Sequence, residues 1–189
     1  ITLADDEANW TGGTLAIQIT ANNEASDTLS ILTSGDVSIS STNISVSGTQ
    51  IASVNAITAT NNNTMTFTFN ANATNANIQT LARAIAYHST SDNPSTSSRT
   101  VTFTLTDAAS ASATATRTID VATANDPPTI SSSGTLSYAE NATATAINSS
   151  ITLADDEANW TGGTLAIQIT ANNEASDTLS ILTSGDVSI

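Results

Sequence analysis

Acidic side chains are grouped at a few points in this sequence, and grouped carboxylates are the residues best suited to chemistry here. The run Asp5-Asp6-Glu7 follows the apolar stretch "ITL", and the same run returns as Asp155-Asp156-Glu157. Ca²⁺ takes about six to eight oxygen ligands from carboxylates, Asn side chains and backbone carbonyls. These runs therefore predict calcium binding in loops at the end of a folded module.

Other candidate oxygen ligands lie where a strand is expected to end or the chain to turn. The further candidate ligands are Asn125 and Asp126 in "ANDPP", Glu140 in "SYAEN", and Asp107 at the end of "TVTFTLTD". The alternative is that they are ordinary turn residues, because Asp and Asn favour turns. We prefer calcium binding for the acidic runs and Asp126, and the turn interpretation for Asp27, Asp36 and Asp92.

The composition excludes several classes of partner. The chain has 189 residues, 17 acidic side chains, no Lys, no Cys, and a formal net charge of −14. Its basic residues are Arg83, Arg99, Arg117 and the single His88. Such a chain repels nucleic-acid phosphates and anionic lipids, so neither nucleic-acid binding nor membrane insertion is expected. Without Cys, no disulfide supports the fold.

A long internal duplication organises the sequence. Ile151–Ile189 is identical to Ile1–Ile39 at every position, which gives a period of 150 residues. Pro127-Pro128 cannot continue a strand ladder, so a boundary is expected just before Asn125. This predicts one repeat over residues 1–124 that lacks its own N-terminal strand region, and the first part of the next repeat over 125–189. We expect the chain to be part of a longer repetitive protein.

Strict alternation of apolar residues with Thr predicts the strands that must position these acids. The strand segments are Thr14–Thr20, Thr64–Phe69, Thr100–Thr106, the β-rich run Thr114–Val121, and a hairpin over Asn43–Val54 that turns at Ser47-Gly48. Alternation gives each strand one buried face. That pattern is typical of antiparallel sheets packed as a sandwich, so we expect an all-β fold.

One segment departs from the strand pattern. In "NATNANIQTLARAIAY", Ile78, Leu81 and Ile85 recur at helical spacing, and Thr74 or Asn75 can cap the start. We therefore expect a short helix over about Asn75–Arg83, crossing one end of the sandwich.

These motifs together resemble the cadherin-like and immunoglobulin-like tandem extender repeats of giant bacterial surface adhesins, including those of the repeats-in-toxin (RTX) type. The most specific part is "NIQTLARAIAYHSTSDNPSTSSRTVTFTLTD", and the resemblance extends over essentially the whole period. It implies β-sandwich modules in a row, outside the bacterial cell, with Ca²⁺ at the linkers and roles in adhesion and biofilms. It also implies metal-ligand roles for Glu140, "ANDPP", Asp155-Asp156 and Asp107.

The sequence departs from the cadherin pattern at two places. Thr123 stands where an acidic residue usually precedes the linker Asn, and Asp155-Asp156-Glu157 replaces Asp-x-Asp. The calcium site is therefore expected to be weaker, or to hold fewer ions, than in cadherins.

Two other functional classes are alternatives, an enzyme and a ligand-binding adhesive module. Catalysis is not expected, because there is one His, no Cys, and no aromatic platform around the adjacent Asp5 and Asp6. A ligand-binding adhesive module for a sugar, ice or another surface is the second class. Trp10 and Trp160, each beside a Gly-Gly pair, could stack on a sugar, although we prefer a role for Trp in closing the core.

The duplicated block raises the question of partners. Two identical 39-residue segments compete for one set of neighbours in Ser40–Ser150, which occurs once. A sandwich could fold without its first strands, or Asp126–Ser150 could fold back to supply them, or neighbouring chains could exchange segments. Besides neighbouring repeats of the same chain, strand exchange between chains is therefore a partner option that the sequence leaves open.

Overall fold

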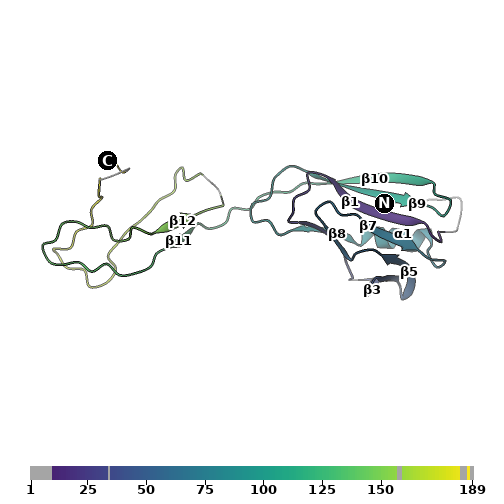
Figure 1. The fold of residues 1–189 in the computed structure, drawn as a ribbon, viewed down its shortest axis with the longest axis horizontal. Coiled ribbons are helices and arrows are strands. Elements are labelled where there is room, and N and C mark those ends of the chain that lie inside the picture. The colour runs from purple at the N-terminus through teal and green to yellow at the C-terminus, as the bar shows by residue number, and fades with distance from the viewer. Residues whose placement is uncertain (1–9, 34, 157–158, 184–186, 188–189) are drawn as a thin grey trace. The chain divides into compact units, whose positions relative to one another are not determined.

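The chain forms two compact units. The computed structural model describes residues 10–33, 35–156, 159–183 and 187. Unit 1 is Ile1–Thr123 and unit 2 is Ala124–Ile189. The described structure is mostly β, with antiparallel sheets and one short helix, as Figure 1 shows.

Unit 1 contains a large and a small antiparallel sheet. The large sheet has the order β10-β9-β1-β7-β5-β4-β3, and the small sheet has the order β6-β2-β8. The large sheet consists of β1 (Thr14–Ala21), β3 (Val37–Ser40), β4 (Asn43–Val46), β5 (Thr49–Val54), β7 (Met65–Phe69), β9 (Arg99–Thr106) and β10 (Ser112–Ile119). The small sheet consists of β2 (Asp27–Ile31), β6 (Thr58–Thr60) and β8 (Ile85–Ser89).

The apolar faces of the two sheets enclose one core. Ile17 of β1 and Phe67 of β7 are fully buried in the same cluster as Leu29 of β2. The Thr residues between these apolar positions face outward, as the alternation predicts. Unit 1 is therefore consistent with a β-sandwich, and the expectation of an antiparallel all-β fold with one short helix is confirmed.

The predicted elements of unit 1 appear close to their expected bounds. The strands β1, β7, β9 and β10 match the four predicted segments within two residues. The predicted hairpin consists of β4 and β5, and its two turn residues, Ser47 and Gly48, have φ values of 49° and 80°. Gly favours this left-handed region, because it has no Cβ to clash with the backbone.

The helix α1 (Asn75–Arg83) connects β7 of the large sheet to β8 of the small sheet. Thr74 caps it, and the Asn77 side chain accepts a hydrogen bond in return from the Thr74 backbone N–H at 2.7 Å. This reciprocal pair satisfies two backbone donors at the helix start. Ile78 and Leu81 are buried, whereas Ile85 belongs to β8.

Unit 2 contains much less regular structure. Its only strands among the described residues are β11 (Thr129–Ser131) and β12 (Thr152–Ala154), which pair antiparallel with Thr129 opposite Ala154. Its large apolar side chains are exposed: 66% for Ile167, compared with 0% for the equivalent Ile17 of unit 1. In the part of the chain that the structure describes, no helix has the length and apolar character needed to span a bilayer.

Candidate functional site

The register of the β11–β12 pair brings two predicted acidic groups to one end of a ladder. Thr129 and Ala154 form the terminal pair, where β11 begins and β12 ends. Asp126 precedes this pair by three residues, and Asp155 follows it directly. Asn125-Asp126 and Asp155-Asp156 therefore enter and leave the ladder at the same end, although they are about 30 residues apart in sequence.

Asp155 and Asn125 define the polar environment at this ladder end. Oδ1 of Asp155 is buried and has no hydrogen-bond partner. The Asn125 side-chain amide donates to the backbone oxygen of Asp126 at 3.3 Å. A buried carboxylate oxygen without a donor is costly, and a hard cation such as Ca²⁺ is one group that satisfies it. Among the described residues, however, no three acidic, His or Cys side chains converge enough to hold a metal ion.

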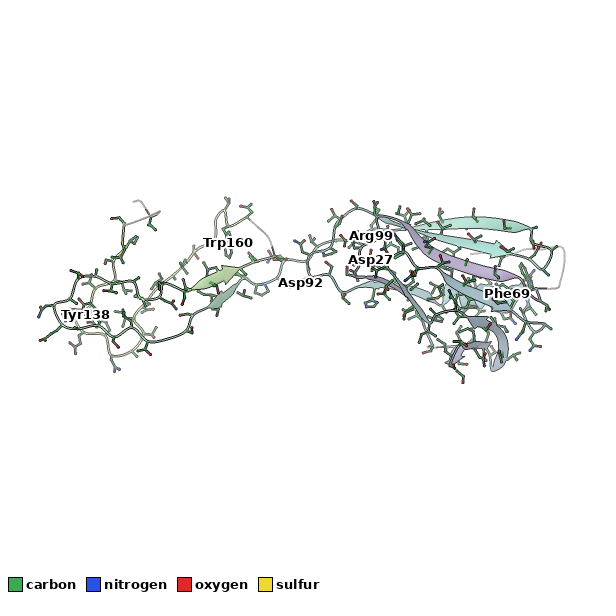
Figure 2. The ribbon with its side chains drawn as sticks, in the orientation of Figure 1. Asp27, Phe69, Asp92, Arg99, Tyr138 and Trp160 are labelled. Atoms are coloured by element: carbon green, nitrogen blue, oxygen red, sulfur yellow. The ribbon has the colours of Figure 1, made fainter. Side chains whose placement is uncertain are left out.

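Glu140 is not brought to the same end of the ladder. The chain leaves β11 at Ser131, the opposite end of the pair, and Glu140 lies in the segment that follows. Its side chain is exposed, and it forms a turn with Asn141. Figure 2 places Tyr138, two residues before it, at the end of unit 2 far from Trp160.

Asp107 belongs to unit 1 and has a local structural role. Its Oδ1 accepts a hydrogen bond from the Ala111 N–H at 2.8 Å, and its own N–H donates to the Ala111 carbonyl at 2.9 Å. These bonds close the turn between β9 and β10, as expected of an Asp in a turn. The other predicted ligands, Asp5, Asp6, Glu7 and Glu157, lie outside the described residues.

The two tryptophans differ sharply although their local sequences are identical. Trp10 is 3% exposed, packs edge-on against Phe69, and donates from Nε1 to Asn75 Oδ1 at 2.6 Å. The core role preferred for Trp is therefore confirmed for Trp10. Trp160 is 49% exposed and, with Ile130, Leu153 and others, lines a cleft of about 300 Å³ in unit 2.

A buried ion-pair cluster in unit 1 was not anticipated. Arg99 donates from Nε to Asp27 Oδ2 at 3.0 Å and from Nη2 to Glu24 Oε2 at 2.6 Å. The Tyr87 hydroxyl donates to Asp27 Oδ1 at 2.7 Å, and the carbonyls of Ser95 and Ser97 accept from Arg99 Nη1. Figure 2 shows Asp27 and Arg99 together, toward the opposite end of unit 1 from Phe69.

The electrostatics of this cluster favour the charged pair. Burial raises the pKa of the Asp27 carboxyl, but hydrogen bonds from Glu24 N–H, Tyr87 and Arg99, with the Arg99 charge, outweigh burial and hold this pKa below its ordinary value. Burial and the neighbouring Asp27 carboxylate raise the pKa of Tyr87. Burial opposes the Arg99 charge, yet Asp27 raises the guanidinium pKa above its usual value. Because Arg99 is paired with both Asp27 and Glu24, we assign the cluster a structural role.

The interpretation of Asp27 as an ordinary turn residue was therefore incomplete. Asp27 does accept from the Glu24 N–H in a turn, at 2.9 Å, but its side chain is fully buried against Arg99. The alternation of faces along each strand could have revealed this pair. Arg99 lies two residues before the buried Val101, and Asp27 lies two residues before the buried Leu29, so each charged residue shares the inward face of its strand.

His88 also has a defined place. It is an exposed residue of β8, opposite Thr28 of β2. It shares no cluster with acidic or Cys side chains in the described part of the chain.

Comparisons with known proteins do not supply a family for this chain. No family model, curated protein or solved structure matches it. Three features of the chain itself therefore bear on function: the acidic ladder end of unit 2, the exposed Trp160, and the duplicated block.

Proposed function

We propose that the chain is a non-catalytic spacer repeat of a large bacterial cell-surface adhesin, in which Ca²⁺ stiffens the junctions between immunoglobulin-like or cadherin-like sandwiches. The duplication at 150 residues supports a role in which length is gained by copying a module. The antiparallel, mostly β structure of unit 1 suits a rigid segment of such a rod.

The observation that carries the calcium part is the ladder end of unit 2. Asp126 and Asp155 lie at the same end of β11–β12, Asp126 follows the start of unit 2 by two residues, and Asp155 Oδ1 is buried without a donor. The ion would be held by Asn125, Asp126, Asp155 and Asp156, with Glu157 as a further ligand, and the first copy of the acidic run, Asp5, Asp6 and Glu7, would bind Ca²⁺ in the same way. Bound Ca²⁺ supplies positive charge that relieves repulsion among these carboxylates.

Calorimetric titration with CaCl₂ tests this site, with MgCl₂ as the competing cation. We expect a saturable heat with Ca²⁺ and none with Mg²⁺, because Mg²⁺ dehydrates reluctantly and demands octahedral geometry. Asp155→Asn should weaken Ca²⁺ binding by about tenfold or more, since ligand charge tunes the affinity of such sites. The matched control is Asp177→Asn, which removes the same charge from unit 2 outside the cluster.

The outcomes separate the two parts of the proposal. No Ca²⁺ heat, or equal loss in Asp155→Asn and Asp177→Asn, would contradict the calcium site. The stiffening itself is measured by small-angle X-ray scattering with Ca²⁺ and with EDTA. A distance distribution that does not narrow with Ca²⁺ would contradict the mechanical role.

The exposed Trp160 favours a second candidate, a ligand-binding adhesive module. An aromatic side chain in an apolar cleft of about 300 Å³ can stack on a sugar ring. Screening of Trp160→Ala and wild type against a glycan array separates the two candidates. A specific, saturable signal that Trp160→Ala loses would favour ligand binding over the spacer role.

A further inference from the structure

The first and last strands in the described part of unit 1, β1 and β10, run parallel to each other on either side of β9. β1 pairs antiparallel with β9, with Thr14 opposite Thr106, and β10 also pairs antiparallel with β9, with Ser112 opposite Thr106. The chain therefore enters β1 at one end of the large sheet, here called the Thr106 end. It leaves β10 at the other end, here called the Arg99 end, where Ile119 lies opposite Arg99.

This arrangement decides how tension acts on unit 1. When the chain before β1 and the chain after β10 are pulled apart, β1 is drawn toward the Thr106 end and β10 toward the Arg99 end. Both strands are then sheared along β9. Because the ladder hydrogen bonds are perpendicular to the strands, the shear loads all of them at once. A pull on β1 and β9 from the same end would instead open the ladder one pair at a time.

The core also resists sliding of β1. Leu15, Ile17 and Ile19 project from the inward face of β1 and are 2%, 0% and 3% exposed. A shift of one residue would move this whole apolar set to the outward face, and a close-packed interior leaves no space for the intermediate positions. Resistance to shear therefore comes from buried side chains as well as from backbone hydrogen bonds.

Side-chain hydrogen bonds fasten the three strands together at the Arg99 end. The Asn22 amide donates to the Ser98 carbonyl at 2.8 Å, and the Thr20 hydroxyl donates to the Thr100 carbonyl at 3.3 Å. These two bonds hold the end of β1 to the start of β9. The Ser98 hydroxyl donates to Asp120 Oδ1 at 2.7 Å, which holds the segment after β10 to the same place.

The buried ion pairs strengthen this end of the sheet. Arg99 lies at the start of β9 and binds Glu24, in the turn after β1, at 2.6 Å and Asp27, the first residue of β2, at 3.0 Å. The Arg99 side chain is 0% exposed, so water does not replace its partners as they separate. If β1 slides toward the Thr106 end, it must pull the turn that carries Glu24 away from Arg99.

We propose that unit 1 is a mechanical clamp in which β1, β9 and β10 carry tension in shear. The side-chain contacts of Ser98 and Arg99 with Asn22, Glu24 and Asp120 are the latch of this clamp. Its biological use rests on the proposed function, because a spacer between a cell and a surface carries tension. The clamp itself is a property of unit 1 and does not require Ca²⁺.

The test is single-molecule force spectroscopy of the full chain in EDTA. The chain has no Cys, so two introduced Cys residues are the only points of attachment. Thr11→Cys with Ala122→Cys loads β1 and β10 in shear, whereas Thr11→Cys with Ala109→Cys pulls β1 away from the β9–β10 turn at the Thr106 end. All three positions are exposed. At one pulling speed, we expect the shear pair to unfold at a force at least about twofold higher, since forced unfolding is governed by the barrier to breaking the loaded bonds.

The latch is tested by Glu24→Gln in both pulling geometries. This substitution removes the charge on Arg99 with little change of shape, and it should lower the shear force toward the peeling force. The peeling force should stay unchanged, because peeling starts at the Thr106 end and reaches the latch last. Ser98→Ala, which loses the bond to Asp120, should have a smaller effect of the same kind. Glu174→Gln, the same change in unit 2, is the matched control and should alter neither force.

Equal forces in the two geometries would overturn the clamp. A shear force that Glu24→Gln leaves unchanged, or an equal fall of both forces, would overturn the latch, because an effect on folding stability alone lowers both. These outcomes are distinct from those of the calcium titration. A directional force difference without any Ca²⁺ heat supports the clamp and contradicts only the calcium site, whereas equal forces with Ca²⁺ binding contradict only the clamp.

Discussion

Residues 10–33 and 160–183 have the same sequence but different structures, and the comparison separates local from long-range causes of folding. Gly12 and Gly162 have φ values of 84° and 85°, and Asn22 and Asn172 have values of 54° and 53°. The first copy forms β1 and β2, whereas the second has no strand over the same positions. Turns are thus common to both copies, and strands are not.

The difference teaches that β-propensity alone does not make a strand in this protein. The Thr-rich alternation of Thr14–Ala21 is present again in the second copy, but only the first copy has β7 and β9 as neighbours. A strand satisfies its backbone groups through its neighbours, and its side chains gain stability from cross-strand packing. Turns need only adjacent residues, and they form in both copies.

The two copies should differ most in stability when a substitution leaves a buried charge without its partner. Asp27→Ala leaves the Arg99 guanidinium buried without its main counter-ion, which should cost about 3–5 kcal/mol of unfolding free energy. Asp177→Ala removes the same side chain from an exposed turn and should leave the stability of unit 1 unchanged. Urea unfolding followed by Trp10 fluorescence, in a Trp160→Phe background, measures both. Similar effects of the two substitutions would contradict the buried cluster.

The same contrast should hold for an apolar side chain. Ile17→Ala deletes fully buried methyl groups and leaves a cavity between the sheets, which should cost about 2–5 kcal/mol. Ile167→Ala, at an exposed position, should change the stability by less than about 0.5 kcal/mol. Both values come from the same urea experiment. A destabilised Ile167→Ala monomer would show that the second copy has a core of its own.

A smaller effect is expected at a glycine. A Cβ at Gly13 would lie 2.6 Å from the Thr106 carbonyl oxygen, whereas at Gly163 the nearest atom is the Trp160 carbonyl oxygen at 3.1 Å. Gly13→Ala must push β1 away from the end of β9, which should cost about 1–3 kcal/mol. Gly163→Ala is the control and should leave the melting temperature of unit 1 unchanged. If Gly13→Ala melts like wild type, β1 and β9 approach less closely than described.

The smallest change in the stability of unit 1 is expected when the pH is lowered. The Asp27 pKa is lowered in the folded state, so folding favours its charged form, and the resulting stability is present above the unfolded pKa of about 3.8. That stability should be lost as pH falls through the lower, folded pKa. In Asp27→Asn this acid-dependent loss should be reduced, while Asp177→Asn should behave as wild type. Urea midpoints at a series of pH values below 5 measure it, and identical profiles for all three proteins would contradict the assignment.

Much of unit 1 could be predicted from the sequence, because its strands alternate cleanly and its helix has a cap. Met65 and Phe67 fall on one face of β7, and Thr74 begins α1, as the pattern indicates. The fate of the second copy could not be predicted in this way. A residue pattern describes which face would be buried, but the presence of a covering partner is a property of the whole chain.

The candidate sites show the same limit. Asp126 and Asp155 were singled out by residue type, yet only the register of β11 and β12 brings them to one ladder end. Arg99 and Asp27 were passed over, because 72 residues separate them and nothing local links them. Their inward parity was visible in the sequence, and a charged residue on an apolar face is a usable signal for a buried partner.

The central place of β1 in the large sheet has a consequence for how the chain is made. Its two neighbours, β7 and β9, are encoded after it, and β9 ends only at Thr106. At about 5–20 residues per second, a ribosome completes β9 on the order of ten seconds after β1. During that interval the nascent Leu15, Ile17 and Ile19 are without their sheet. Synthesis of unit 1 thus includes a period in which β1 is complete but both of its sheet neighbours are not.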